Sequence, residues 1–248
     1  MLIASPSLCQ EDSSRALRSN GRRSVGGIRN GGDPIRGRSQ MSARDGMLDA
    51  AAEEMIERGY AASSLSSIAA RLSLTKGAFA REFPTKGMLA HEIMESLARA
   101  IEGEHAAASA AFPGSGTRAL ARFLFGVDVR VRREPQVAAA ISLLSDRALP
   151  PLESKRSLEL WRAAVEELFE RALADGEVVE AVEAADAVGF LAVSKLGATV
   201  LEVRRIDPNA RERGLSVMRF ALRAVGLRDV DAAVDDATDQ LERFSGLD

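Results

Sequence analysis

The sequence predicts an all-α protein: a small N-terminal head of three helices, followed by a larger C-terminal helical bundle. Apolar residues recur at three- and four-residue steps along most of the chain, which is the period of an amphipathic α-helix. The period of two that marks a half-buried strand does not occur. A chain of 248 residues can bury a core without a metal or a disulfide. We therefore expect one or two globular helical domains.

Composition excludes several classes of protein. Cys9 is the only cysteine, which excludes an intramolecular disulfide, a cysteine-rich zinc site and a dithiol redox centre, and which fits a reducing cytoplasm. The most apolar stretch, 187–203, contains Ser194 and Lys195 and is shorter than the roughly 20 residues that cross a bilayer. Residues 1–40 lack the apolar segment of a secretory signal. We expect a cytoplasmic protein with no membrane span, no metal and no cofactor.

Charge is distributed unevenly. Residues 1–40 carry seven basic and three acidic residues, residues 41–90 carry six of each, and the remainder carries 20 basic against 27 acidic residues. The end of the chain that suits nucleic acid is therefore the N-terminus. Because residues 1–40 are rich in Gly, Ser and Arg and poor in apolar residues, we expect them to form a disordered basic tail. Met41 follows directly, so the tail is either a start-site artefact or an arm that reaches DNA.

Three short helices are predicted within residues 41–88. The first ends at Gly59, since glycine readily adopts the left-handed conformation that closes a helix. Ser64 and Thr75 can cap the N-termini of the second and third helices, and Pro84 stops the third. The second and third helices have the spacing of a helix-turn-helix, in which the latter lies in the DNA major groove. The apolar faces of the three helices are Leu48, Ala51, Ala52 and Met55, then Leu65, Ile68, Ala69 and Leu72, then Phe79 and Phe83.

A longer fourth helix, which Thr85 can cap, joins this head to the rest of the chain. It presents an apolar residue at every fourth position, from Leu89 to Ile101. We assign residues 89–226 to a second helical domain and residues 227–248 to a C-terminal tail. After a loop at residues 113–116, further helices are predicted at 117–133, 137–148, 155–174, 184–203 and 208–225, with Pro135, Pro150, Pro151, Gly176 and Pro208 between them.

Several runs of residues in the head resemble the N-terminal signature of the tetracycline-repressor (TetR) family. The resemblance implies a transcriptional regulator, a homodimer with two DNA-reading heads and at least nine helices per subunit, in which residues 89–226 form the helical regulatory and dimerisation domain. It further implies that a small-molecule effector releases the double-stranded DNA operator by changing the spacing of the heads. The runs that carry the resemblance are Ala50-Ala51-Ala52, Arg58-Gly59-Tyr60, Ser64 to Ala69, Leu74 to Phe79 and Phe83 to Lys86.

Hydroxyl and basic residues cluster at the N-termini of the helix-turn-helix helices, where backbone N–H groups and the helix dipole suit phosphate. These residues can also be ordinary helix caps. Many TetR members carry Tyr and His where this chain has Ala80 and Glu82. Glu82, about 100° from Phe83 around the helix, should be exposed and repel phosphate. We expect altered but retained operator recognition; the alternative is a helical protein-binding module that has lost it. The candidate DNA-binding residues are Ser63, Ser64, Ser66, Thr75, Lys76, Gly77, Phe79, Arg81 and Lys86.

The segment around Trp161 resembles the one that lines the pocket of gamma-butyrolactone receptors, a subgroup of the same family. The resemblance rests on Leu160-Trp161-Arg162, Leu168, Ala172 and 176–178, and on the region 128–144. It implies an effector such as a gamma-butyrolactone, although Trp161 can equally be a core residue. Lys195 can face the ligand, extend to the surface or pair with an acid across a dimer interface formed by 184–203 and 208–225. The candidate ligand-binding residues are Trp161, Val165, Leu143, Leu144, Lys195 and Thr199.

Catalytic activity is not expected. The two histidines, His91 and His105, fall on or just after the fourth helix, and neither has a nucleophile or metal ligand at a suitable spacing. The sequence also lacks a phosphate-binding loop motif. Its chemistry is therefore that of a binding protein.

Overall fold

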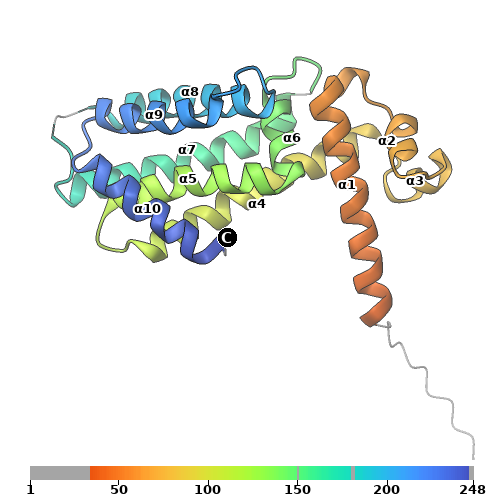
Figure 1. Cartoon of the computed structure of the whole chain (residues 1–248), viewed down its shortest axis with the longest axis horizontal. Helices are drawn as coiled ribbons and strands as arrows, with labels where there is room; N and C mark the ends of the chain where they lie inside the picture. Colours follow the sequence, from red (N-terminus) through yellow and green to blue (C-terminus); the bar gives the residue numbers. More distant parts are fainter. Residues whose placement is uncertain (1–33, 150, 180–181, 246–248) are drawn as a thin grey trace, which may run out of the picture.

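The computed structural model describes residues 34–149, 151–179 and 182–245, and within these ranges the chain forms ten α-helices and no strand. The predicted all-α fold is confirmed. Figure 1 shows a head made of α1 to α3 beside an elongated bundle, with α4 running from one into the other. The helices are α1 Pro34–Ala62, α2 Leu65–Arg71, α3 Lys76–Glu82, α4 Lys86–Ala111, α5 Gly116–Arg133, α6 Pro135–Leu144, α7 Pro151–Ala174, α8 Ala184–Val203, α9 Ala210–Ala224 and α10 Val230–Ser245.

The three predicted helix caps are all present. The Ser64 hydroxyl accepts a hydrogen bond from the backbone N–H of Ser67 at 3.0 Å. Thr75 caps α3 and Thr85 caps α4 in the same way. Each cap satisfies one of the N–H groups that have no partner in the first turn of a helix. The sequence therefore sets the starting points of α2, α3 and α4 locally, before any tertiary contact forms.

The N-terminal boundary of the first helix was predicted wrongly. Helix α1 begins at Pro34, so residues 34–40 are helical, whereas we expected the whole of residues 1–40 to be disordered. Proline suits the first helical position because its φ is already fixed there, and a helix, once begun, gains one hydrogen bond per added residue. Residues 1–33 lie outside the described residues. Gly59, with φ 77° and ψ 168°, kinks the helix but does not end it, because a last turn continues to Ala62.

The C-terminal segment is not a tail. Helix α10 packs along α5 and buries an apolar side, and Arg118 of α5 pairs with Asp236 at 2.6 Å. Acidic residues dominate this segment, and they hid the three- and four-residue spacing of its apolar positions. The expected tail at 227–248 is therefore corrected to a packed helix through Ser245. Its buried apolar residues are Val230, Ala233, Val234, Ala237 and Leu241.

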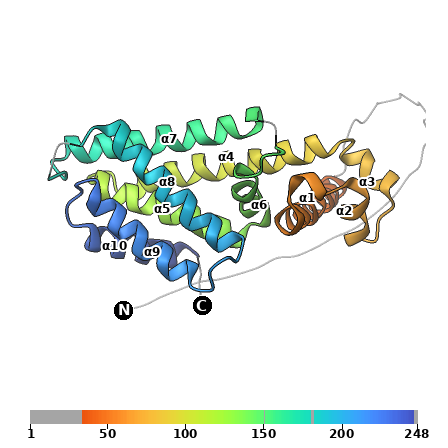
Figure 2. The same cartoon turned by 90° about the horizontal axis from the view of Figure 1, so that it is seen from above.

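The bundle is arranged in layers, with α8 and α9 side by side on its outer face (Figures 1 and 2). Helices α4, α5 and α7 pack against one another beneath them. The short helix α6 lies across the end of the bundle that faces the head. It ends at Leu144, four residues before the predicted position, where Asp146 closes a turn by accepting the backbone N–H of Ala148 at 2.9 Å.

The head is attached to the bundle mainly through α6. Helix α6 packs extensively against α1. The Asp146 carboxylate, just after α6, accepts the backbone N–H of Tyr60 at 2.7 Å, directly after the Gly59 kink. At the other end of α6, the Gln136 side chain donates to Asp49 of α1 at 3.2 Å and accepts from Ser96 of α4 at 2.8 Å. The position of α6 therefore sets the position of the head relative to the bundle.

Candidate nucleic-acid interface and ligand cavity

Six of the nine predicted DNA-binding residues are exposed on α2, α3 and the caps that precede them. In Figure 1 these two helices lie on the side of the head away from the bundle. A Cβ at Gly77 would meet no atom within 4 Å, so the backbone is open at the start of α3. A DNA groove that approaches this side of the head would therefore meet short or basic side chains, and the bundle would not block it. The six residues are Ser64, Ser66, Thr75, Lys76, Gly77 and Arg81.

Two predicted DNA contacts are buried and were assigned wrongly. Ser63 is only 3% exposed, and its hydroxyl donates to the Gly59 carbonyl at 2.7 Å, closing the last turn of α1. Phe79 is fully buried, with its ring centroid 5.9 Å from that of Phe83 in the core of the head. Both side chains are buried inside the head, so neither is available to contact DNA.

Lys86 was also assigned to DNA, and it is engaged within the protein instead. Its ammonium donates to the backbone carbonyls of Tyr60 at 2.7 Å, Ala61 at 3.2 Å and Ser63 at 3.1 Å. It also lies 4.4 Å from the centre of the Tyr60 ring. The last carbonyls of a helix lack partners within the helix, and a cation beside them offsets the negative end of its dipole. Lys86 therefore ties the end of α1 to the start of α4.

Helix α2 is held against α1 by a partly buried charge cluster. Glu54, only 1% exposed, accepts from Arg71 Nε at 2.6 Å and also lies 3.4 Å from Arg58 Nε. Burial by itself raises the pKa of Glu54, but hydrogen bonds from Ser67 and Arg71 and the charges of Arg58 and Arg71 outweigh it, so the pKa is lowered. Glu54 is thus ionised at neutral pH and fixes Arg71 inside the head.

The charges on α3 are mixed. Glu82 is exposed, as the helical geometry predicted, and Arg81 beside it is exposed too. Ala80 is half-buried and has no polar group to offer a phosphate. Lys76 and Arg81 therefore supply the positive charge of α3, and Glu82 opposes part of it.

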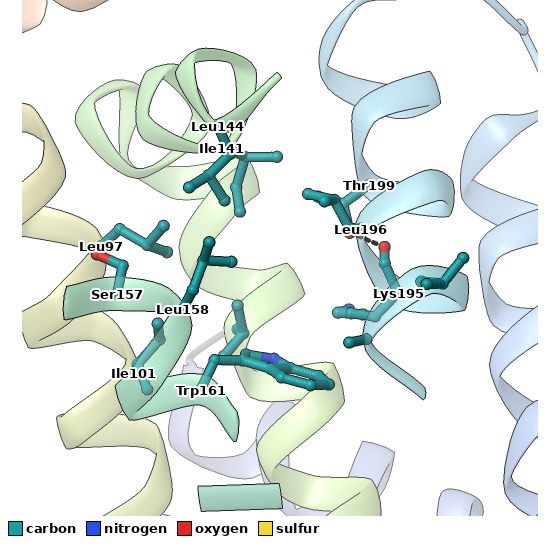
Figure 3. Close-up of a pocket in the computed structure, with 13 residues that line it drawn as sticks. Leu97, Ile101, Ile141, Leu144, Ser157, Leu158, Trp161, Lys195, Leu196 and Thr199 are labelled. Atoms are coloured by element: carbon teal, nitrogen blue, oxygen red, sulfur yellow. Dashed lines mark hydrogen bonds between the residues drawn. The ribbon is translucent and has the colours of Figure 1, made fainter. Parts of the chain in front are cut away.

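A cavity of about 150 Å³ lies in the bundle between α4, α5, α6, α7 and α8 (Figure 3). The ring of Trp161 extends from α7 toward α8 across it, and Lys195 and Thr199 approach from α8. A second hollow shares Leu158, Trp161 and Ala192 with the first, so Trp161 lies where the two meet. The cavity is lined by Leu97, Ile101, Val127, Ile141, Leu144, Ser157, Leu158, Trp161, Ala192, Val193, Lys195, Leu196 and Thr199.

Four of the six predicted ligand-binding residues line this cavity: Trp161, Leu144, Lys195 and Thr199. Leu143 and Val165 do not line it, and both are buried in the core. Leu143 is rotated by about 100° from Leu144 around α6, which is enough to turn it from the cavity to the interior.

Lys195 lines the cavity, in agreement with one of its three predicted roles, but its ion-pair partner was not predicted. It is 5% exposed, and its ammonium pairs with Asp128 of α5 in the same subunit. The expectations that it extends to the surface, or pairs with an acid across a dimer interface, are therefore wrong. Asp128 is the only acid in α5 and lies within the mostly apolar run 123–129, so an acid there with a lysine in the apolar helix α8 was the signal that could have revealed the pair.

Comparison with known proteins identifies the head. Residues 47–93, from α1 into α4, match the family model "Bacterial regulatory proteins, tetR family". The chain carries a TetR head. No curated protein sequence matches the chain significantly.

Solved structures share the whole architecture. The TetR family protein CprB from S. coelicolor A3(2) is 24% identical, with a TM-score of 0.68 over 83% of this chain and 98% of CprB. A gamma-butyrolactone receptor described as ArpA-like is 24% identical, with a TM-score of 0.65 over 84% of this chain and 100% of its own. SmeT, the repressor of a Stenotrophomonas maltophilia multidrug efflux pump, is 20% identical, with a TM-score of 0.61 over 75% and 91% of the two chains. At these identities the likeness establishes the TetR fold and no more.

The position of Lys86 in the TetR head generates a test. We expect Lys86→Met to lower the free energy of unfolding by about 1 to 3 kcal/mol, because three backbone carbonyls lose their donor, two of them in partly buried hydrogen bonds. Urea denaturation followed by circular dichroism measures the change. Lys76→Met is the matched control, and since Lys76 is exposed its stability should stay within about 0.5 kcal/mol of the wild type. A Lys86→Met protein as stable as the control would show that the ammonium does not hold α1 to α4.

Proposed function

We propose that this chain is a ligand-responsive, DNA-binding transcriptional regulator that acts as a homodimer in the cytoplasm, and that it represses until a small molecule releases it. The TetR head supports the DNA-binding part of this proposal. The fold supports the ligand-binding part, since the structures that share it include a gamma-butyrolactone receptor and a complex of SmeT with triclosan.

One observation carries the proposal: the cavity and the head share helix α6. Ile141 and Leu144 of α6 line the cavity, while Gln136 and Asp146, at the two ends of α6, bond to α1 of the head. A ligand that contacts Ile141 and Leu144 would shift α6 to fit its own shape, and because α6 and α1 are closely packed, α1 would move with it. The ligand thereby favours the orientation of the head that goes with an occupied cavity. In a dimer this change alters the spacing of the two heads.

The head would bind an operator through its exposed residues. We assign phosphate and groove contacts to Ser64, Ser66, Thr75, Lys76, Gly77 and Arg81. Lys76 is the best candidate for an ionic contact, because it is exposed and opens α3 beside the uncovered backbone of Gly77. Glu82 weakens but does not cancel this attraction.

The cavity suits a small, largely apolar effector such as a gamma-butyrolactone. An apolar cavity of about 150 Å³ in another protein binds benzene, so a five-membered lactone ring fits. The second hollow, lined on its far side by Ala185, Val188 and Gly189, offers space for an alkyl chain. Trp161 would then contact both parts of the ligand.

The outer face of α8 and α9 fits the dimer. Among the residues that the structure describes, eleven large hydrophobic residues are exposed, and seven of them lie on α8, on α9 or in the loop between them. On α8, Phe190, Val193 and Leu201 form one stripe at helical spacing. Helix α8 is also the one helix of the described part that is long and apolar enough to cross a membrane by length and composition. A second copy of the chain covers this surface, as the TetR resemblance implies.

Two observations favour a second function. Glu82 places a negative charge on the exposed side of α3, and Lys86 is bound to backbone carbonyls, so the head has few cations available for DNA. In this alternative the protein is a helical regulatory or protein-binding module that has lost operator binding. An electrophoretic mobility shift with the DNA upstream of its own coding region separates the two, since specific, salt-dependent binding supports the regulator and its absence supports the module.

We expect Lys76→Ala to weaken operator binding and to lower the slope of log affinity against log salt concentration by about one, as the loss of one phosphate contact requires. Fluorescence anisotropy with labelled operator at several salt concentrations measures both quantities. Lys155→Ala is the control, because Lys155 is exposed on α7 of the bundle. Equal affinities and slopes for the two variants would remove Lys76 from the interface.

We expect Phe220→Glu to convert the dimer to a monomer. Phe220 is 68% exposed on α9, and a buried, unpaired carboxylate at a subunit interface is strongly unfavourable. Light scattering coupled to size exclusion gives the mass. Val179→Glu introduces the same change at a residue that is 61% exposed outside α8 and α9, and this variant should stay dimeric. A dimeric Phe220→Glu protein would place the interface elsewhere.

A further inference from the structure

The cavity contains one ion pair and little other free polarity. Among the thirteen residues that line it, Lys195 is the one charged side chain. Its ammonium pairs with Asp128 of α5, which lines a smaller hollow between α5, α8 and α9. Both are largely buried, with 7% and 14% of the two side chains exposed. The pair presents an N–H donor to the cavity and adds no net charge to it.

The remaining polar groups of the cavity narrow the choice of ligand. The Thr199 hydroxyl donates to the Lys195 carbonyl at 2.9 Å, and the Ser157 hydroxyl donates to the Met94 carbonyl at 3.3 Å. Their protons are therefore used within the protein. The donors left for a ligand are the Lys195 ammonium on α8 and the indole N–H of Trp161 on α7, which lie on opposite walls of the cavity (Figure 3).

From this arrangement we infer that Asp128 determines specificity: by neutralising Lys195, it makes the cavity select an uncharged ligand with a hydrogen-bond acceptor, such as an intact lactone, and reject the carboxylate of its ring-opened form. The inference rests on the proposed function of the cavity as an effector site. It concerns which charge state binds there, and it assigns a role to a residue that does not itself line the cavity.

Electrostatics in a buried site supports this selection. A carboxylate bound at Lys195 would share one ammonium with Asp128 and leave one negative charge uncompensated away from water, which is costly. Two other cations line the smaller hollow beside Asp128: Arg132 lies 3.9 Å from Glu202, and Arg211 is exposed on α9, where water screens its charge. A cationic ligand would face Lys195 directly. A neutral carbonyl avoids both costs and still accepts a hydrogen bond.

The test compares gamma-decalactone with sodium gamma-hydroxydecanoate, its ring-opened salt, on the full-length protein at neutral pH. The fluorescence of Trp161 reports binding, since the chain has no other tryptophan. We expect the lactone to bind at least about tenfold more tightly than the salt. If the salt binds as tightly as the lactone, the inference is overturned while the effector site stands. If neither compound binds, the proposed lactone-binding function of the cavity fails first.

Two variants then test Asp128 itself. Asp128→Asn leaves Lys195 as an unpaired cation, so the preference for the lactone should fall by about tenfold or more because the salt now supplies the missing charge. The double variant Asp128→Leu with Lys195→Met removes both charges and should go on rejecting the salt. An Asp128→Asn protein whose preference equals that of the wild type overturns the assignment. Should that single variant not fold, a double variant that binds the salt as well as the lactone also overturns it.

Discussion

The packing of the short helix α6 is the interaction on which the rest of the molecule depends, because α6 contacts the head on one side and the cavity of the bundle on the other. Toward the head it packs on α1, with Asp146 holding the backbone just after the Gly59 kink. Toward the bundle it closes one end of the cavity with Ile141 and Leu144. Because α6 is closely packed on both sides, it cannot move without its neighbours, and under the proposed function a ligand in the cavity would therefore be coupled to the orientation of the head.

The head and the cavity use charge in different ways. In the head, Lys86 joins α4 to α1, and the Glu54–Arg71 pair joins α1 to α2. The exposed cations of α3 are therefore Lys76 and Arg81. In the bundle, Lys195 and Asp128 cancel one another beside an apolar space. Counting cations in the sequence therefore overstates the positive charge available to DNA and gives the wrong charge for the cavity. The difference arises from partners that are distant in sequence.

Local signals were enough to predict much of the fold. Ser64, Thr75 and Thr85 cap the helices that they were expected to cap, because a cap depends only on residues within one turn. Contacts between residues that are distant in the sequence were harder to predict. Phe79, Ser63 and Lys86 were expected to contact DNA, and only the folded head shows that Phe79 packs on Phe83, that Ser63 bonds to Gly59 and that Lys86 bonds to the end of α1. Helix α10 was missed because acidic residues hid its apolar spacing, and Asp128 because its partner is on another helix.

The proposed coupling through α6 is tested most directly by the distance between the two heads of the proposed dimer. A spin label at Ala70→Cys, exposed on α2, in a Cys9→Ser background gives one site per subunit, since Cys9 is the only native cysteine. Double electron–electron resonance then reports the inter-head distance with and without gamma-decalactone, with binding verified by Trp161 fluorescence. The account predicts that bound lactone shifts the distance distribution and that Asp146→Ala, which breaks the bond to α1, reduces the shift. A distribution that stays the same when the lactone is bound would contradict it.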